Sequence, residues 1–152
     1  LFNLIEDFYK KFSKTADENN LRIRHYGSRK KLSKKILKII DRVVLQTKDN
    51  TGTYVNLLFN YGSRDEINDA INSIIKSNNK AVNIRNHFYA PKSQDPDLII
   101  RTGGEKRLSN FMLWQAAYAE LYFTKVLWPD FSIIHLRKAI IDYFKRVRKH
   151  GK

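Results

Sequence analysis

The chain has 152 residues, so we expect a single domain spanning 1–152. Its 29 lysines and arginines against 15 aspartates and glutamates give a net charge of +14, which favours polyanionic partners: nucleic acid, diphosphates or an anionic membrane surface. The sequence has no cysteine, which excludes disulfides and thiolate metal sites, and no apolar run of membrane-spanning length.

Apolar residues recur with helical and strand spacing along the chain, and the two patterns alternate. They predict these elements in order: helix 1–12, strand 21–26, helix 32–43, strand 54–59, helix 67–75, short helix 82–88, strand 98–100, helix 114–118, strand 120–123 and helix 133–147. Ser63 and Glu66 have capping-box spacing, and Ser132 is placed to cap the last helix. This order predicts an α/β fold with a mostly parallel central sheet flanked by helices, whose ligands bind beyond the carboxyl ends of the strands.

The same patterns separate surface from core. The helix 32–43 carries lysines opposite its apolar residues, and a solvated face is the ordinary interpretation: Lys30, Lys31, Lys34, Lys35 and Lys38. The last helix is expected to turn its apolar residues inward: Ile133, Leu136, Ile140, Phe144 and Val147. Trp114 and Trp128 are also expected in the core.

The motif RTGGE, residues 101–105, directly follows the strand 98–100, where ligand loops lie. Gly103 and Gly104 permit unusual backbone conformations and let amide N–H groups approach an anion. Arg101 and Arg107 can bind a phosphate bidentately, and Ser109 adds a hydroxyl donor. The residues alone leave two interpretations open, an anion site or a glycine turn with surface arginines.

Two glutamates accompany this motif. Glu120 lies in the apolar stretch AYAELYF, where a carboxylate needs a cationic partner. It is either the ion-pair partner of an arginine or a Mg²⁺ ligand, since Mg²⁺ binds one or two carboxylates together with substrate phosphates. Glu105 is a second candidate, although pairing with Arg101 or Arg107 is the more ordinary role for a loop carboxylate.

A second motif, NYGSR at residues 60–64, lies between a predicted strand and a predicted helix. Gly62 suits a tight turn there, and a helix N-terminus favours anions, although this signal is weak by itself. The four histidines are scattered, and they match no metal-ligand spacing: His25, His87, His135 and His150.

Three stretches together resemble the undecaprenyl diphosphate synthases of the cis-prenyltransferase family. The long stretch RTGGEKRLSNFMLWQAAYAELYFTKVLWPDF resembles the family signature, and NYGSRDEI and LRIRHYGSRKKL resemble two preceding segments. The resemblance implies an enzyme that condenses isopentenyl diphosphate onto farnesyl diphosphate with cis double bonds, giving undecaprenyl diphosphate, with Mg²⁺ as cofactor. It also implies a cytoplasmic homodimer that associates with the membrane surface through its lipid product.

The family's functional positions match residues of this chain. By resemblance, Arg101, Arg107 and Ser109 hold the isopentenyl diphosphate, and Glu120 helps to bind Mg²⁺. The remaining matched residues are expected to shape the site: Asn60, Gly62, Arg64, Gly103, Gly104 and Glu105.

Some family features are missing from these residues. Neither the amino-terminal phosphate-binding loop with its aspartate, in a context like MDGNGRW, nor a segment like FSSENW occurs. Near the end, Lys149-His150-Gly151 stands where Arg-Phe-Gly is frequent. We therefore expect the chain to be the C-terminal portion of a catalytic domain, supplying the isopentenyl diphosphate half-site and inactive alone.

Two other functions fit parts of the sequence. A non-catalytic partner subunit would also lack the aspartate, but such a subunit would not need the arginine clamp. A basic nucleic-acid-binding domain is favoured only by charge, because the aromatic residues fall at apolar-face positions and are not interleaved with the basic ones. We therefore expect no nucleic-acid partner.

Overall fold

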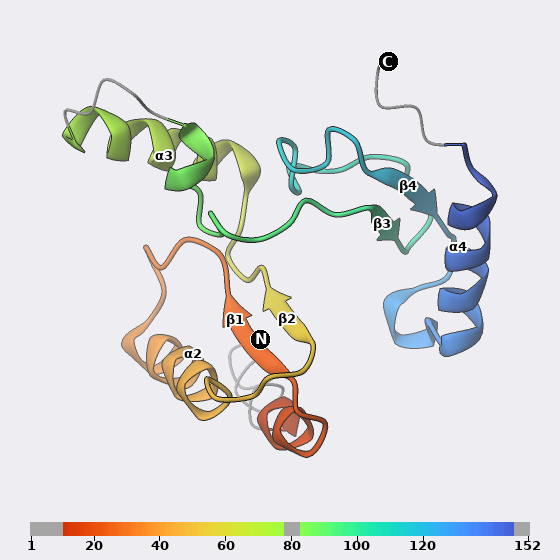
Figure 1. Cartoon of the computed structure of the whole chain (residues 1–152), viewed down its shortest axis with the longest axis horizontal. Coiled ribbons are helices and arrows are strands. Elements are labelled where there is room, and N and C mark those ends of the chain that lie inside the picture. Colours follow the sequence, from red (N-terminus) through yellow and green to blue (C-terminus); the bar gives the residue numbers. More distant parts are fainter. Residues whose placement is uncertain (1–10, 78–82, 148–152) are drawn as a thin grey trace. The chain divides into compact units, whose positions relative to one another are not determined.

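The computed structural model describes residues 11–77 and 83–147, which divide into two compact units with a boundary between Pro91 and Lys92 (Figure 1). The predicted helix 1–12 lies largely outside the described residues, and residues 11–18 are helical. The other elements of the first unit are β1 (Arg22–His25), α2 (Lys34–Gln46), β2 (Tyr54–Leu57), α3 (Ser63–Ser77) and the 3₁₀ helix η1 (Ile84–His87).

Strands β1 and β2 form a parallel pair, with Ile23 opposite Val55. Helix α2, which connects β1 to β2, packs its apolar side onto β1. The buried cluster comprises Ala16, Ile23, Ile36, Ile40 and Val43. Helix α2 begins where Ser33 accepts a 3.3 Å hydrogen bond from the Ile36 N–H. The spacing of the apolar residues in α2 therefore produces the core of this unit.

The loops that follow β1 and β2 approach each other closely. A Cβ added to Gly27 would lie 2.1 Å from the Phe59 carbonyl oxygen, so only glycine fits there. Just beyond it, the Ser28 N–H donates to the Asn60 carbonyl at 3.0 Å. Glycine thus permits the backbone contact that joins the carboxyl ends of the two strands.

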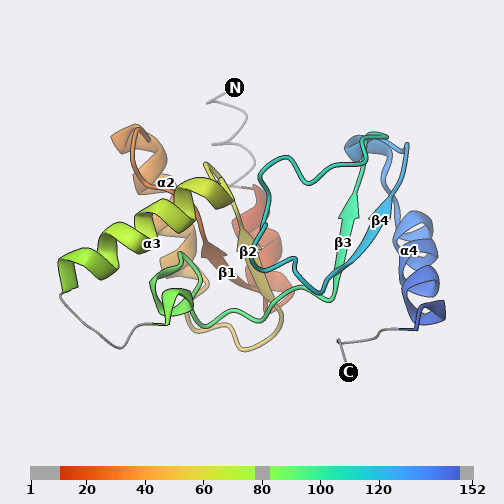
Figure 2. The same cartoon turned by 90° about the horizontal axis from the view of Figure 1, so that it is seen from above.

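The second unit contains another parallel pair, β3 (Leu98–Arg101) and β4 (Glu120–Phe123), followed by the 3₁₀ helix η2 (Trp128–Asp130) and α4 (Ile133–Lys145). Figure 2 shows β3 beside β4 with α4 alongside β4. Both strand pairs are parallel, as predicted.

The predicted helix 114–118 is wrong. Residues 113–118 form consecutive turns, in which the Ala116 N–H bonds to the Met112 carbonyl but the Ala117 N–H bonds to the Trp114 carbonyl. The preceding Ser109, Asn110 and Met112 have φ values of 48°, 65° and 46°. Because left-handed residues do not propagate a right-handed helix, no continuous ladder forms.

Much of the apolar surface of α4 is exposed, contrary to prediction. Ser132 is the N-cap residue of the helix, as expected, and its N–H donates to His135 Nδ1 at 3.1 Å. However, Phe144 is 78% exposed and Ala139 is the buried residue of the helix. Trp114 and Trp128 are also exposed. A pair of short strands offers too little surface to cover these side chains.

Candidate functional site

The carboxyl end of β3 opens onto a cavity of about 260 Å³. It is lined by Ile99, Ile100, Arg101, Thr102, Leu108 and Phe111. The predicted site residue Arg101 therefore meets an apolar lining at the end of a parallel strand, where ligands bind in sheets of this type. A cationic guanidinium beside apolar side chains suits a ligand with an anionic head and a hydrocarbon body.

Gly103 and Gly104 have φ values of 88° and 83°, as the prediction of unusual backbone conformations required. Their N–H groups donate to the carbonyls of Val126 at 2.9 Å and Thr124 at 2.8 Å. These amides are therefore engaged by backbone and do not point to an anion, which corrects that part of the expectation. The glycine pair fixes the loop against the segment that follows β4.

The segment 108–112 stores backbone strain. Ser109, Asn110 and Met112 are non-glycine residues in the left-handed region, each at a cost on the order of 1 kcal/mol. Leu108 and Phe111 from the same segment line the cavity. Strain of this kind concentrates at functional sites, and here it includes Ser109, one of the predicted phosphate ligands.

Arg107 forms an ion pair with Glu105, and both side chains are at least half exposed. Glu105 thus has the ion-pairing role that the sequence indicated as the more ordinary one for a loop carboxylate. Arg107 and Ser109 are not among the described residues that line the cavity beside Arg101. Arg101 ends β3 and the other two predicted phosphate ligands lie in the loop that follows it, but only Arg101 lines the cavity.

Glu120 is also paired. Its Oε2 accepts a 2.7 Å hydrogen bond from Nη1 of Arg146. The same nitrogen donates to the Leu121 carbonyl, and Nη2 of Arg146 donates to Asp142. The hydrogen bond to Glu120, followed by the bond to Asp142, raises the pKa of Arg146 above its ordinary value. Glu120 is therefore half-buried in an ion pair with Arg146. An ion pair with an arginine was one of the two roles that the sequence left open for Glu120.

The register of the strand pair separates Glu120 from Arg101. Glu120 lies opposite Leu98 at the start of β3, whereas Arg101 lies opposite Phe123 at the end of β4. Three residues of strand separate the two positions, roughly 10 Å at 3.3 Å per residue. Among the described residues, no cluster of three or more acidic or histidine side chains could hold a metal.

The second motif lies in the first unit, where Asn60 joins two loops. With φ of 55°, it directs its side-chain amide to the carbonyls of Ser28 at 2.6 Å and Lys30 at 3.1 Å. Gly62 is buried and its carbonyl accepts from the Glu66 N–H at 3.0 Å, while Arg64 is exposed. These contacts give Asn60 and Gly62 a role in loop geometry.

Glu66, which the sequence indicated only as a helix cap, is 1% exposed. Its carboxyl oxygens accept from the Tyr61 hydroxyl at 2.7 Å and the Tyr89 N–H at 3.0 Å. The Tyr89 hydroxyl donates to Asp69 at 2.8 Å; burial first, and then this bond, raises the pKa of Tyr89 to about 12. Because these partners are up to 23 positions apart, no local pattern indicates the network.

Comparison with known proteins identifies the family. Residues 1–151 match the family model described as "Putative undecaprenyl diphosphate synthase". An isoprenyl transferase of Streptococcus agalactiae is 41% identical over 99% of this chain, which covers 66% of that protein, and one of Rickettsia bellii is 43% identical with 69% of its length covered. The chain thus spans about two thirds of the length of these relatives.

Solved structures agree in fold. A structure from Campylobacter jejuni described as a probable undecaprenyl diphosphate synthase superposes with a TM-score of 0.89 at 33% identity, and covers 99% of this chain and 73% of its own. A lavandulyl diphosphate synthase from Lavandula x intermedia in complex with dimethylallyl diphosphate gives 0.91 at 28% identity, covering 99% and 69%. This chain therefore belongs to the undecaprenyl diphosphate synthase family of isoprenyl transferases.

Proposed function

We propose that the chain is the C-terminal part of an isoprenyl transferase catalytic domain that condenses isopentenyl diphosphate onto farnesyl diphosphate, with cis double bonds, to give undecaprenyl diphosphate. The observation that carries this proposal is the cavity at the end of β3, where Arg101 meets apolar side chains. The dimethylallyl diphosphate in the lavender neighbour supports a prenyl diphosphate as the ligand class.

Each part of the loop has a role in this proposal. Arg101 and Arg107 neutralise the diphosphate of isopentenyl diphosphate, and Ser109 donates a hydrogen bond to it. Before Arg107 binds substrate, it exchanges its contact with Glu105 for the diphosphate. Leu108 and Phe111 contact the hydrocarbon part and exclude water from it. The loop thus orients isopentenyl diphosphate for attack on the allylic carbon as the allylic diphosphate leaves.

The expected Mg²⁺ does not fit the described residues of a single chain. Glu120 is paired with Arg146 and lies at the opposite end of the strand pair from Arg101. Mg²⁺ needs oxygen ligands gathered around one point, with substrate phosphates among them. The described residues therefore do not complete a Mg²⁺ site around Glu120, and its metal-binding role stays a prediction.

In this proposal the 152 residues do not complete a turnover by themselves. The reaction has two prenyl diphosphate substrates, and the diphosphate group of each needs its own cationic or metal-assisted site. The loop 101–109 offers one such site, and no glycine-rich loop with an aspartate precedes Gly27 in the sequence. Incorporation of labelled isopentenyl diphosphate into lipid, with farnesyl diphosphate and Mg²⁺, should be absent for the chain alone. Fusion to the amino-terminal third of the Streptococcus agalactiae relative should restore it.

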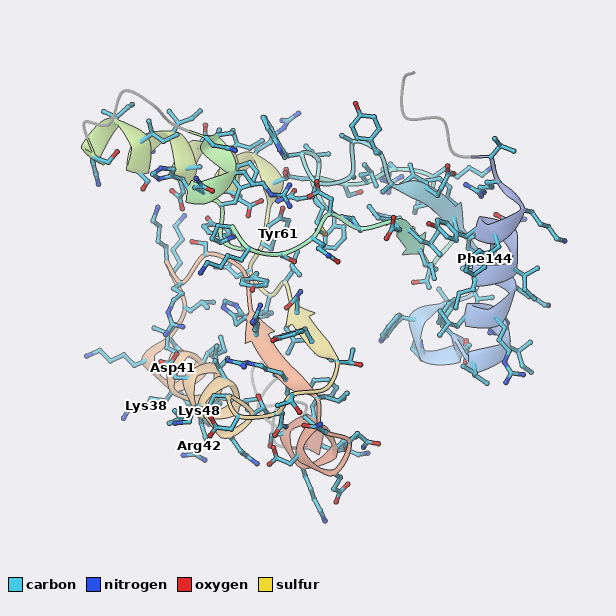
Figure 3. The ribbon with its side chains drawn as sticks, in the orientation of Figure 1. Lys38, Asp41, Arg42, Lys48, Tyr61 and Phe144 are labelled. Carbon is cyan, nitrogen blue, oxygen red and sulfur yellow. The ribbon has the colours of Figure 1, made fainter. Side chains whose placement is uncertain are left out.

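We also infer a homodimer, with the region from Ala116 to Trp128 at or beside the interface. Trp128 is 76% exposed, and α4 presents Phe144 and other apolar side chains to solvent (Figure 3). Exposed apolar surface of this extent marks an interaction site. Sedimentation equilibrium should give twice the mass of the chain, and a monomer at all concentrations would refute the dimer.

Binding of isopentenyl diphosphate tests the substrate site directly. Charge-assisted hydrogen bonds contribute roughly 1.5–3 kcal/mol each, so Arg101→Ala and Arg107→Ala should each weaken binding about tenfold or more in calorimetric titrations. Lys138→Ala, an exposed lysine of α4, is the control with the same change in charge. Equal affinity in all four proteins would contradict the assignment.

A further inference from the structure

The outer side of α2 carries a basic face, which we define as Lys34, Lys38, Arg42 and Lys48 together with Leu45. All five residues are exposed, and Leu45 is 63% exposed. Figure 3 labels Lys38, Arg42 and Lys48 on α2 and the turn that follows it. Leu45 comes seven positions after Lys38 and eleven after Lys34, spacings that return to one side of an α-helix. An exposed leucine therefore lies among the cations of the basic face.

The arrangement of these charges opposes helix stability. Lys34, Lys38 and Arg42 follow one another at i, i+4 spacing, where like charges repel. The first turn of α2 contains no acidic residue to complement the helix dipole. Asp41, the acidic residue of α2, accepts from Arg29 through both carboxylate oxygens at 2.9 Å. The cations of the basic face therefore slightly destabilise the helix by mutual repulsion.

Leucine among the cations indicates which kind of polyanion fits. At an anionic bilayer, lysine and arginine approach the lipid phosphates while an apolar side chain enters the boundary between headgroups and acyl chains. A surface for single-stranded nucleic acid would instead present aromatic side chains for base stacking, and none of the five residues is aromatic. The chemistry of the face therefore favours the bilayer.

We propose that the basic face of α2 docks the protein on the surface of an anionic phospholipid bilayer. The opposite side of the helix packs Ile36, Ile40 and Val43 into the core, so docking requires no opening of the fold. No helix in the described residues is long and apolar enough to cross a bilayer. Binding through α2 is peripheral and electrostatic, and none of its residues lines the proposed prenyl diphosphate site.

The test is co-sedimentation of the chain with vesicles in the absence of prenyl diphosphates. The protein should pellet with vesicles of phosphatidylglycerol and phosphatidylcholine but not with phosphatidylcholine alone. Raising the ionic strength should release it, because salt screens exposed charges. The double variant Lys34→Gln, Lys38→Gln should bind at least about tenfold more weakly, because each cation near an anionic surface contributes about 1 kcal/mol. Leu45→Gln should also weaken binding while keeping the net charge.

The matched control is Lys138→Gln, Lys145→Gln, which removes the same charge from exposed positions of α4. It should bind vesicles within about twofold of the unmodified chain, and circular dichroism should show that all variants are folded. Equal losses in the α2 and α4 variants would show that only net charge matters and would overturn the proposal. An effect of Lys34→Gln, Lys38→Gln on oligonucleotide binding, with none on vesicles, would overturn it in favour of nucleic acid.

Discussion

Arg146 near the end of α4 donates a 2.7 Å hydrogen bond to the carboxylate of Glu120 at the start of β4. The same guanidinium donates to Asp142 at 2.5 Å and to the Leu121 carbonyl at 3.1 Å. One side chain therefore ties α4 to the first two residues of β4. The planar fork of arginine can reach several acceptors at once, which lysine cannot.

Arg146→Ala should lower the melting temperature, since it removes these contacts and leaves Glu120 without its cation. Arg146→Lys should fall between the alanine variant and the unmodified chain, because it keeps the charge but not the fork. Lys145→Ala, exposed and adjacent, is the control and should change little. Thermal unfolding, monitored by circular dichroism, gives the melting temperature of each variant. Equal melting temperatures for Arg146→Ala and Arg146→Lys would show that the geometry of the guanidinium is unimportant here.

Replacing Glu105 tests whether its ion pair with Arg107 competes with substrate. Glu105→Gln removes the charge that holds Arg107, so isopentenyl diphosphate should bind more tightly, by about two- to fivefold for an exposed pair. Arg107→Ala should act in the opposite direction. Calorimetric titration of both variants supplies the comparison. Weaker binding by Glu105→Gln would mean that Glu105 orients Arg107 for the ligand.

Stability should fall in mild acid because of His25. Burial lowers the pKa of His25 below 6.5, and the charge of Arg29 adds to this, while the hydrogen bond to Phe59 and the charge of Asp41 oppose it. A lowered pKa means that the folded state favours neutral imidazole. The contribution is therefore complete above pH 6.5 and is lost as the pH falls through the folded-state pKa.

Urea unfolding of the unmodified chain at about pH 7.5 and about pH 5.5 should show this loss as a lower midpoint in acid. His25→Gln, which can still donate to the Phe59 carbonyl but does not titrate, should lose less between the two conditions. Parallel declines in the two proteins would assign the acid sensitivity to other groups.

Glu66 should be critical for the stability of the first unit. Glu66→Ala leaves the Tyr61 hydroxyl and the Tyr89 N–H without this acceptor, at roughly 1–3 kcal/mol each. Tyr61→Phe removes one of the two bonds and should cost about half as much. Urea unfolding measures both, with the exposed Asn68→Ala of α3 as the control. A loss below about 1 kcal/mol for Glu66→Ala would show that water replaces the acceptor.

The order and type of most elements could be predicted from the sequence, because they depend on local spacing. The apolar residues of α2 recur on one side, and the structure buries Ile36, Ile40 and Val43 from that side. The alternation in Arg22–His25 likewise gave β1. Local spacing failed at residues 114–118, where left-handed residues just upstream prevent a helix that the composition would allow.

The stretch 101–131, together with two earlier segments, also indicated the family from sequence alone. What each group contacts was decided by tertiary structure. The amides of Gly103 and Gly104 bond to carbonyls at 124–126, some twenty positions later, and Glu120 pairs with an arginine 26 positions away. Parallel pairing places Glu120 and Arg101 at opposite ends of the β3–β4 pair. The register of a strand pair depends on both strands, so the sequence of one strand does not determine it.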